Sequence, residues 1–235
     1  MTRILLLNGA PRSGKDTIAT MLKNRSSSTI HIEKFATPLK LTVPLIYNVS
    51  REKWEKELDT PRNKDLACNE FFGKTPREVQ ISLSEDFLKP LHGKTIFGEL
   101  LVRRINNLIK KNDLDSIIVS DSGFYHEAKE VVDFFGADTV ELWRVHRDGC
   151  NFSKDSRGYI NLHEDGVTIY DIQNNGSLDD LRLLVEPLYD AFNLPRETNN
   201  EGAEGWKERR LLAGQQAFAS WPSRKIEHIK HGERK

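Results

Sequence analysis

The stretch that decides the fold runs from residue 3 to residue 17, where Arg3-Ile4-Leu5-Leu6-Leu7-Asn8 is followed by Gly9-Ala10-Pro11-Arg12-Ser13-Gly14-Lys15-Asp16-Thr17. The first six residues form a compact apolar run that ends directly at a glycine, which is typical of a buried strand. Residues 14–24 then carry apolar side chains at helical spacing. A glycine-rich turn between a strand and a helix predicts a phosphate-binding loop, because backbone N–H groups and the positive helix end point toward an anion.

The turn matches the pattern G-x-x-x-x-G-K, which is typical of loops that hold a nucleoside triphosphate. Its glycines let the backbone approach the phosphates, and Lys15 supplies a mobile ammonium for the β- and γ-phosphates. Asp16 stands where switch GTPases and motor ATPases have the Ser or Thr that holds magnesium. The hydroxyl comes one residue later, at Thr17, where it would cap the phosphates or reach the metal. The predicted ATP-binding residues of this loop are Gly9, Arg12, Ser13, Gly14, Lys15, Asp16 and Thr17.

The rest of the chain alternates between expected strands and expected helices. Buried strands are expected at 29–35, 116–120, 139–145 and 167–172, and amphipathic helices at 127–135 and 178–192. Pro44 is expected to break the helical pattern early in the chain, and Pro187 to kink or interrupt the last helix. The alternation predicts an α/β fold in which a parallel sheet is covered by helices on both faces and ligands bind at the carboxyl ends of the strands.

The composition is that of a globular protein without an overall attraction to polyanions. The chain has 235 residues, and its 35 basic side chains balance 35 acidic ones. This balance argues against nucleic acid or a membrane surface as a partner. The two cysteines, Cys68 and Cys150, form neither a disulfide framework nor a metal-ligand spacing, and no apolar run is long enough to cross a bilayer. A cytoplasmic protein is therefore expected.

Four segments, taken in their order, resemble the bacteriophage deoxynucleoside monophosphate kinases over roughly residues 1–193. The most specific is the loop itself, because Gly14-Lys15-Asp16-Thr17 is a variant of the G-K-G-T order of nucleoside monophosphate kinases. The other three segments are Phe35-Ala36-Thr37-Pro38-Leu39-Lys40, Thr75-Pro76-Arg77-Glu78-Val79-Gln80 and Ile172-Gln173-Asn174-Asn175-Gly176-Ser177-Leu178. Their order carries the resemblance more than any one of them.

The resemblance implies transfer of the γ-phosphoryl group of ATP to a deoxynucleoside 5′-monophosphate, with Mg²⁺ as cofactor and ADP and a diphosphate as products. A phage-encoded enzyme of this kind would work in the host cytoplasm. Such a reaction needs two anionic substrates held in line with their charge neutralised, and little covalent work falls to the protein. Arg77 and Lys40 are the candidates for the acceptor phosphate. Gln80, one helical turn from Arg77, is the candidate for contacting a base edge.

Asp121 is the candidate at the end of the strand at 116–120, where a carboxylate would hold magnesium through water or orient a loop, and a helix-capping role is the alternative. Members of the family place an arginine soon after this aspartate, whereas this chain has Ser122-Gly123-Phe124-Tyr125-His126. His126 or an arginine of the lid would have to substitute for it. The predicted metal ligands are Thr17, Asp16 and Asp121.

The polar segment at 146–165 is expected to be a lid that lies outside the core and closes over the transferring phosphate. Arg147 matches the lid arginine of the family best, and Arg157 lies further along. The predicted catalytic residues are Lys15, Asp121 and Arg147. Arg144, together with the turn of Asn174, Asn175 and Gly176, is predicted to bind ATP, and the turn is expected to pack against the adenine.

The expected organisation is a P-loop kinase fold with a helical substrate-binding insertion and a lid. The kinase domain is expected to span residues 1–195, with its core at 1–36 and 113–195, the insertion at about 37–112 and the lid at about 146–165. Residues 196–235 form a C-terminal extension to which no role is assigned, and a homodimer is left open.

Two other functions stay open at this point. A P-loop kinase for another small phosphorylated metabolite, such as dephospho-coenzyme A or phosphomevalonate, would share the strand, the loop and the lid. A nucleotide-binding protein without catalysis would keep the phosphate loop and lose the acceptor site. The loop is common to all three readings, so only the acceptor pocket discriminates between them.

Overall fold

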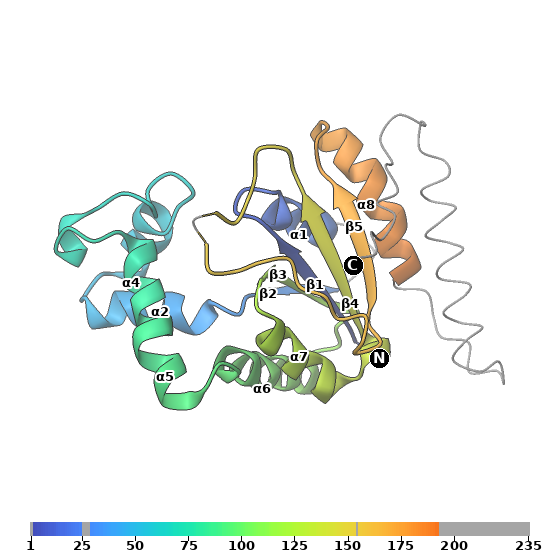
Figure 1. The fold of residues 1–235 in the computed structure, drawn as a ribbon, viewed down its shortest axis with the longest axis horizontal. Helices are drawn as coiled ribbons and strands as arrows, with labels where there is room; N and C mark the ends of the chain where they lie inside the picture. The colour runs from blue at the N-terminus through green and yellow to red at the C-terminus, as the bar shows by residue number, and fades with distance from the viewer. Residues whose placement is uncertain (1, 25–28, 154, 193–235) are drawn as a thin grey trace, which may run out of the picture.

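The computed structural model describes residues 2–24, 29–153 and 155–192. Its strands form one sheet in the order β2-β3-β1-β4-β5, and every neighbouring pair is parallel. Figure 1 shows this sheet with helices packed on it and a group of helices standing to one side. The predictions on residues 196–235 lie outside the described part of the chain.

The central strand carries the phosphate loop. β1 (Arg3–Gly9) lies between β3 (Ser116–Ser122) and β4 (Val140–His146), while β2 (Ile30–Glu33) and β5 (Thr168–Gln173) form the two edges. In the register of the sheet, the end of β1 lies beside the ends of β3 and β4. The residues that follow these three strands therefore meet at one edge of the sheet, where ligands bind in folds of this kind.

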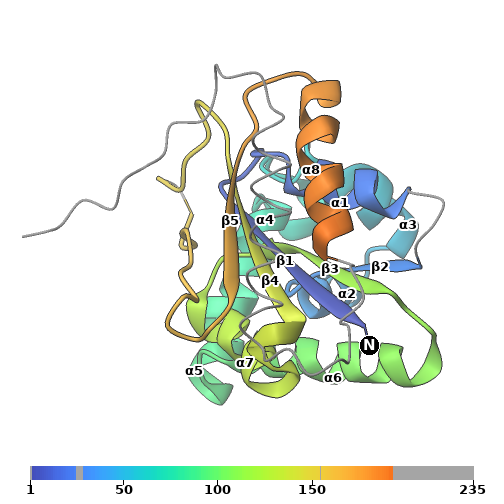
Figure 2. The same ribbon diagram turned by 90° about the vertical axis from the view of Figure 1, so that its right-hand side faces the viewer.

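Alternation along β1 sends its side chains to two separate hydrophobic layers. Leu5 and Leu7 belong to the layer covered by α1 (Lys15–Lys23) and α8 (Leu178–Phe192). Ile4 and Leu6 belong to the opposite layer, covered by α6 (Ile96–Lys111) and α7 (Tyr125–Phe135). Figure 2 shows the helices on the two sides of the sheet. The predicted α/β fold, with a parallel sheet covered on both faces, is confirmed. α8 also runs through Pro187 without an interruption.

The helical insertion stands apart from the sheet at the left of Figure 1. It contains α2 (Thr37–Ile46), α3 (Arg51–Lys53), η1 (Trp54–Leu58), η2 (Asn69–Phe71), α4 (Pro76–Ser82), η3 (Leu83–Leu88) and α5 (Lys89–His92). Trp54 and Phe71 are the largest side chains of a small core of its own, in which their rings meet edge to face at 5.9 Å. The expected break at Pro44 is wrong, because Pro44 lies inside α2 and is buried. A second, smaller core lets the insertion hold its own shape beside the sheet.

The last helix of the predicted insertion belongs to the body of the domain instead. Phe97, Leu101 and Ile105 on α6 are buried in the same layer as Ile4 and Leu6 of the central strand. The part that stands away from the sheet therefore ends near residue 92, and not near residue 112.

The predicted lid connects β4 to β5, and the short turn η4 (Ala137–Thr139) precedes β4. Its second half is tied down by Asn8, whose side-chain nitrogen donates to the carbonyl of Gly158 at 2.9 Å and whose oxygen accepts from the amide of Ile160 at 3.1 Å. Ile160 and Leu162 are buried in the core, so the expectation that this segment lies outside the core is wrong for these two residues.

Candidate active site

Close backbone contacts explain the two glycines of the phosphate loop. A Cβ at Gly9 would lie 2.4 Å from the carbonyl oxygen of Val145, which leaves no room for a side chain. Gly14 has a φ of +106°, and a Cβ there would lie 2.3 Å from Nδ2 of Asn174. That Nδ2 donates to the carbonyl of Ser13 at 2.7 Å. The turn after β5 thus clamps the loop from outside and holds its shape.

Lys15 is folded back into the loop that it belongs to. Its Nζ donates to the carbonyl oxygens of Gly9 at 2.7 Å and Ala10 at 2.8 Å, and the side chain is buried. Burial, followed by the positive charge of Arg157, lowers the pKa of Lys15 from 10.5 to about 8. These carbonyls satisfy the ammonium without an anion, and a phosphate in the loop would be a stronger partner for it.

A cleft of about 240 Å³ opens in front of the loop and is bounded by the loop, the insertion and the lid. Its lining contains seven cationic side chains: Arg12, Lys15, Lys34, Lys40, Lys64, Arg77 and Arg157. It also contains six carboxylates: Asp16, Asp59, Glu85, Asp121, Glu127 and Asp155. Such a density of cations from separate elements is what the binding of two phosphorylated ligands requires, and the carboxylates keep the cleft close to neutral without them.

The structure brings the three predicted acceptor residues together on the insertion side of the cleft. Arg77 donates from Nε to Asp65 at 2.5 Å, and Lys40 pairs with the nearly buried Asp59. Nε2 of Gln80 lies 3.4 Å from Oδ1 of the same Asp59. Each of these three side chains thus already contacts a carboxylate, and their predicted role at an acceptor stays a prediction.

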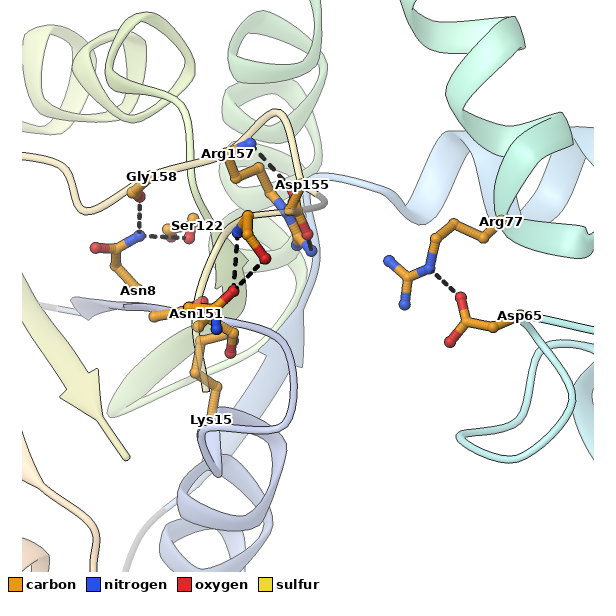
Figure 3. A network of polar contacts seen from close by, with 12 residues as sticks. Asn8, Lys15, Asp65, Arg77, Ser122, Asn151, Asp155, Arg157 and Gly158 are labelled. Carbon is orange, nitrogen blue, oxygen red and sulfur yellow. Dashed lines mark hydrogen bonds and ion pairs between the residues drawn. The ribbon is translucent and has the colours of Figure 1, made fainter. Parts of the chain in front are cut away.

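Arg157, and not Arg147, is the lid arginine that lines the cleft. Its guanidinium forms a two-pronged pair with Asp155, at 2.8 Å and 2.5 Å. Its aliphatic stem covers Gly123, where a Cβ would lie 2.5 Å from Cδ of the arginine. Figure 3 shows Arg77 pointing across the cleft toward this pair. An arginine of the lid therefore lies beside the segment after Asp121, and its substitution for the expected arginine there stays a prediction.

Arg147 and Arg144 lie away from the cleft lining. Arg147 is exposed just past β4, and no side-chain partner for it is found among the described residues. Arg144 forms a two-pronged pair with Asp171 at 2.9 Å and 2.5 Å, and His146 contacts the same carboxylate at 2.5 Å. Burial raises the pKa of Asp171, but the hydrogen bonds from His146 and Arg144 outweigh it and bring this pKa to about 2. This ion cluster ties β4 to β5, and the predicted ATP contact of Arg144 stays a prediction.

Asp121 and Asp16, the predicted carboxylate ligands of magnesium, both line the cleft, but they differ in how many of their oxygens already accept hydrogen bonds. Asp121 accepts from the backbone amides of Phe35 at 2.7 Å and Ala36 at 3.1 Å, so it anchors the chain that leads into α2. Asp16 uses Oδ1 to accept from Lys34 at 2.6 Å and from Ser120 at 2.8 Å. Carboxylate oxygens are the ligands that Mg²⁺ prefers, and Asp16 retains a second oxygen for it.

Within the described ranges, no group of three or more His, Cys, Asp or Glu side chains is placed so that it could hold a metal ion. Thr17, the third predicted ligand, is exposed on α1 and does not line the cleft. Its predicted role stays a prediction.

The turn after β5 forms hydrogen bonds with segments on both sides of it. Asn174 is buried, and its amide donates to the carbonyl of His146 at 2.7 Å. Asn175 accepts from the amide of Asp148 at 2.8 Å, and a Cβ at Gly176 would lie 2.5 Å from Oδ2 of Asp180. The turn joins the phosphate loop to the start of the lid, whereas its predicted contact with adenine stays untested.

Six charged residues of the lining escaped the sequence prediction: Lys34, Asp59, Lys64, Glu85, Glu127 and Asp155. Lys34 and Lys64 lie in connecting segments without a motif, and Asp59 follows a short helical turn. Glu127 looks in sequence like an ordinary acidic residue of a first helical turn. A clustering of charges on a helical insertion was the only available signal, and it does not single out these residues.

None of the helices in the described part of the chain combines the length and the hydropathy needed to cross a membrane.

No protein-family model and no curated protein sequence matches the chain. Solved structures with some likeness include a Thermus thermophilus protein, which is 15% identical over 80% of this chain and 97% of its own, with a TM-score of 0.40. A dephospho-CoA kinase from Campylobacter jejuni is 13% identical over 77% of this chain and 92% of its own, with a TM-score of 0.38. A thymidylate kinase from Candida albicans is 15% identical over 80% of this chain and 91% of its own, with a TM-score of 0.37. Likenesses this distant say nothing about substrate or activity, so the function has to be inferred from the site itself.

Proposed function

We propose that the chain is a kinase that transfers the γ-phosphoryl group of ATP to a deoxynucleoside monophosphate. The observation that carries the proposal is the cleft, which is lined by the phosphate loop, by Lys40, Lys64 and Arg77 of the insertion and by Arg157 of the lid. Figure 3 shows Lys15 and Arg77 on different sides of it. Two separate groups of cations suit two phosphorylated ligands, a donor in the loop and an acceptor on the insertion. A site for ATP alone would need only the first group.

The proposed reaction balances without further reactants. An oxygen of the acceptor phosphate attacks the γ-phosphorus of ATP, a new phosphorus–oxygen bond forms, and the bond to the β-phosphate oxygen breaks to release ADP. Magnesium, when bound through Asp16 and the triphosphate, would neutralise charge on the β- and γ-phosphates. Lys15 leaves its carbonyl partners for the phosphates of ATP. Arg157 stabilises the charge on the group in transfer.

The insertion side supplies the grip on the acceptor. The guanidinium of Arg77 can hold two phosphate oxygens at once, which Lys40 and Lys64 cannot do alone. Burial, followed by the charge of Arg77, lowers the pKa of Lys64, as expected where cations converge without a bound anion. A phosphate dianion bound beside Lys64 and Arg77 would relieve the repulsion between these two cations, which favours binding of the acceptor.

The test is release of ADP from Mg-ATP with a panel of deoxy- and ribonucleoside monophosphates, dephospho-coenzyme A and phosphomevalonate. At least one deoxynucleotide is expected to accelerate ADP release well above the rate without an acceptor. Lys15→Ala is expected to lower that rate by about 100-fold or more, because one preorganised contact to transition-state charge is worth roughly this much. Lys23→Ala, at the exposed end of the same helix, is the matched control and should keep the rate.

Other outcomes of the panel decide between the alternatives. Stimulation by dephospho-coenzyme A or phosphomevalonate, and not by nucleotides, would move the assignment to another small metabolite. ATP binding without stimulation by any acceptor would favour a nucleotide-binding protein without catalysis. A cytoplasmic location, a phage origin and self-association stay predictions that this panel does not address.

A further inference from the structure

One part of the cleft lining has a different chemistry from the cationic part. Its walls are the apolar side chains of Leu39, Ile81, Phe97 and Phe124, which come from α2, α4, α6 and the residue before α7. Leu39 and Phe97 are 7% and 2% exposed, so they form a fixed floor. Ser84, Glu85 and Glu127 supply polar atoms to the same lining. Apolar walls with a few polar groups are typical of a pocket for the uncharged part of a ligand.

Glu127 is the unusual group in this pocket. Its side chain is only 5% exposed, and its one ion pair is with Nζ of Lys89 at 3.3 Å from Oε1. Lys89 is shared, because the same Nζ lies 2.8 Å from Glu85 and 3.7 Å above the ring centre of Phe124. Within the described ranges no hydrogen bond reaches the second oxygen of Glu127. A buried carboxylate oxygen in a lining position is therefore available to a ligand.

A buried carboxylate is costly, and here its surroundings do not compensate that cost. Burial raises the pKa of Glu127 to about 7 even though Lys89 lowers it, and the charges of Asp121 and Glu85 raise it further. The neighbouring Arg157 is engaged by Asp155. A side chain of similar volume without a charge would pack this position at lower cost, so packing alone gives no reason for a glutamate.

We propose that this pocket holds the base of the acceptor and that Glu127 accepts a hydrogen bond from an exocyclic amino group on it. Guanine, adenine and cytosine carry such an amino group, whereas thymine and uracil present carbonyl oxygens at the matching positions. At a pH above its pKa of about 7, at which the binding is to be measured, Glu127 is a carboxylate that only accepts, so a carbonyl oxygen facing it would be repelled. The substrate class is then a nucleoside monophosphate with an amino-bearing base. This inference rests on the proposed function only in taking the acceptor to be a nucleotide.

The position of Gln80 agrees with this assignment and changes its predicted role. Nε2 of Gln80 faces Asp59 and the carbonyl of Pro76, at 3.4 Å and 3.3 Å, on the side where Lys40 and Arg77 lie. Through Asp59, which also pairs with Lys40, Gln80 thus belongs with the cationic part of the cleft. Base recognition, which the sequence placed on Gln80, belongs to Glu127.

The test is equilibrium binding of matched nucleotides to the full chain by calorimetry, which needs no turnover. The pairs are dCMP against dUMP, which differ at one amino position, and dGMP against dIMP, which differ by the 2-amino group alone; dAMP and dTMP complete the set. In at least one pair the amino-bearing member is expected to bind at least about tenfold more tightly, the loss typical of a polar group left without its partner. dTMP and dUMP are expected to be the weakest ligands.

Glu127→Gln is the specific variant, because it keeps the volume and gives the side chain an N–H that can face a carbonyl. It is expected to reduce the difference within the pair by about tenfold, while Glu130→Gln on the same helix and outside the cleft lining leaves it unchanged. If Glu127→Gln does not fold, the wild-type pairs decide alone. Equal binding within both pairs, or tightest binding of dTMP or dUMP, overturns the proposal.

The same data separate the two proposals. Turnover with all bases alike would leave the kinase in place and remove the base pocket. Selective binding without turnover would keep the base pocket and remove the kinase.

Discussion

Lys15 shows how a single residue links the fold to pH. Its ammonium is buried near Arg157, and both burial and that charge favour the neutral amine, so its pKa lies near 8 instead of 10.5. The free protein therefore holds Lys15 protonated below pH 8 and loses the proton as the pH rises through that value. The neutral amine cannot attract phosphate, so the phosphate loop is weakened on the alkaline side.

We predict that kcat/KM for ATP falls as the pH rises above about 8, because this ratio reports the ionisation of the free enzyme. Arg157→Gln removes the second-largest cause of the low pKa and is expected to move the falling limb to higher pH, by less than the full shift since burial remains. The measurement is the pH profile of ADP release at low ATP. Arg182→Gln, exposed on α8, is the control, and a limb that does not move in Arg157→Gln would contradict the assignment.

At the scale of elements, the lid packs closely against Gly123, the residue after β3, because a glycine has no side chain to keep it away. Gly158 donates its amide to the carbonyl of Gly123 at 3.1 Å, and the stem of Arg157 lies where a side chain at Gly123 would be. Asn8 fixes the same turn through Ser122 and Gly158, both at 2.9 Å. The guanidinium reaches the cleft because β1 and the segment after β3 hold the backbone of the neighbouring Gly158 (Figure 3).

Gly123→Ala should displace Arg157 without unfolding the protein. The new Cβ would lie 2.5–2.7 Å from three carbons of the arginine stem, so the whole side chain has to move. We expect kcat to fall by about 10- to 100-fold, the cost of a displacement of about 1 Å at a reacting group, with little change in the unfolding temperature. Gly158→Ala is the control, since a Cβ there meets nothing within 4 Å. Equal kcat in both variants would argue against a role for Arg157 in the transfer.

The same elements show what the sequence can and cannot predict. The loop, the strands and α8 follow from local pattern, because glycine spacing and apolar periodicity are properties of short segments. The choice of Arg157 over Arg147 depends on Asn8 and Gly123, which lie far away in the chain, so motif spacing selects the wrong arginine for the cleft. Glu127 escapes for the same reason, since the residues that bury it come from other helices. Pro44 stays inside α2 because tertiary packing overrides its low helix propensity.

At the scale of the whole molecule, the insertion and the sheet have separate cores. Phe71 is 1% exposed and packs with Trp54 and Tyr47, and the small core that they form does not share a buried residue with either layer of the sheet. The phosphate loop belongs to the sheet, and the cations that we propose for the acceptor belong to the insertion. Damage to one core should therefore affect one ligand more than the other.

Phe71→Ala is predicted to weaken binding of the nucleoside monophosphate and to spare binding of ATP. Truncating a buried phenylalanine costs about 3–5 kcal/mol, which exceeds what a small core of five buried side chains can absorb. Calorimetric titration of each ligand in turn measures the two affinities. Leu183→Ala, 66% exposed on α8, is the control, and a parallel loss of both affinities in Phe71→Ala would show that the two cores unfold together.

The carboxylates that pair with Lys40, Arg77 and Arg157 affect how other anions of the cell compete for the cleft. Each of these cations is already satisfied within the protein, by Asp59, Asp65 and Asp155 in turn. A lone phosphate, a chloride ion or a stretch of nucleic acid can compete for one such partner but gains little by displacing it. Only a molecule that reaches several of these cations together gains enough to enter, so the internal ion pairs act as a filter that admits ligands by shape and not by charge alone.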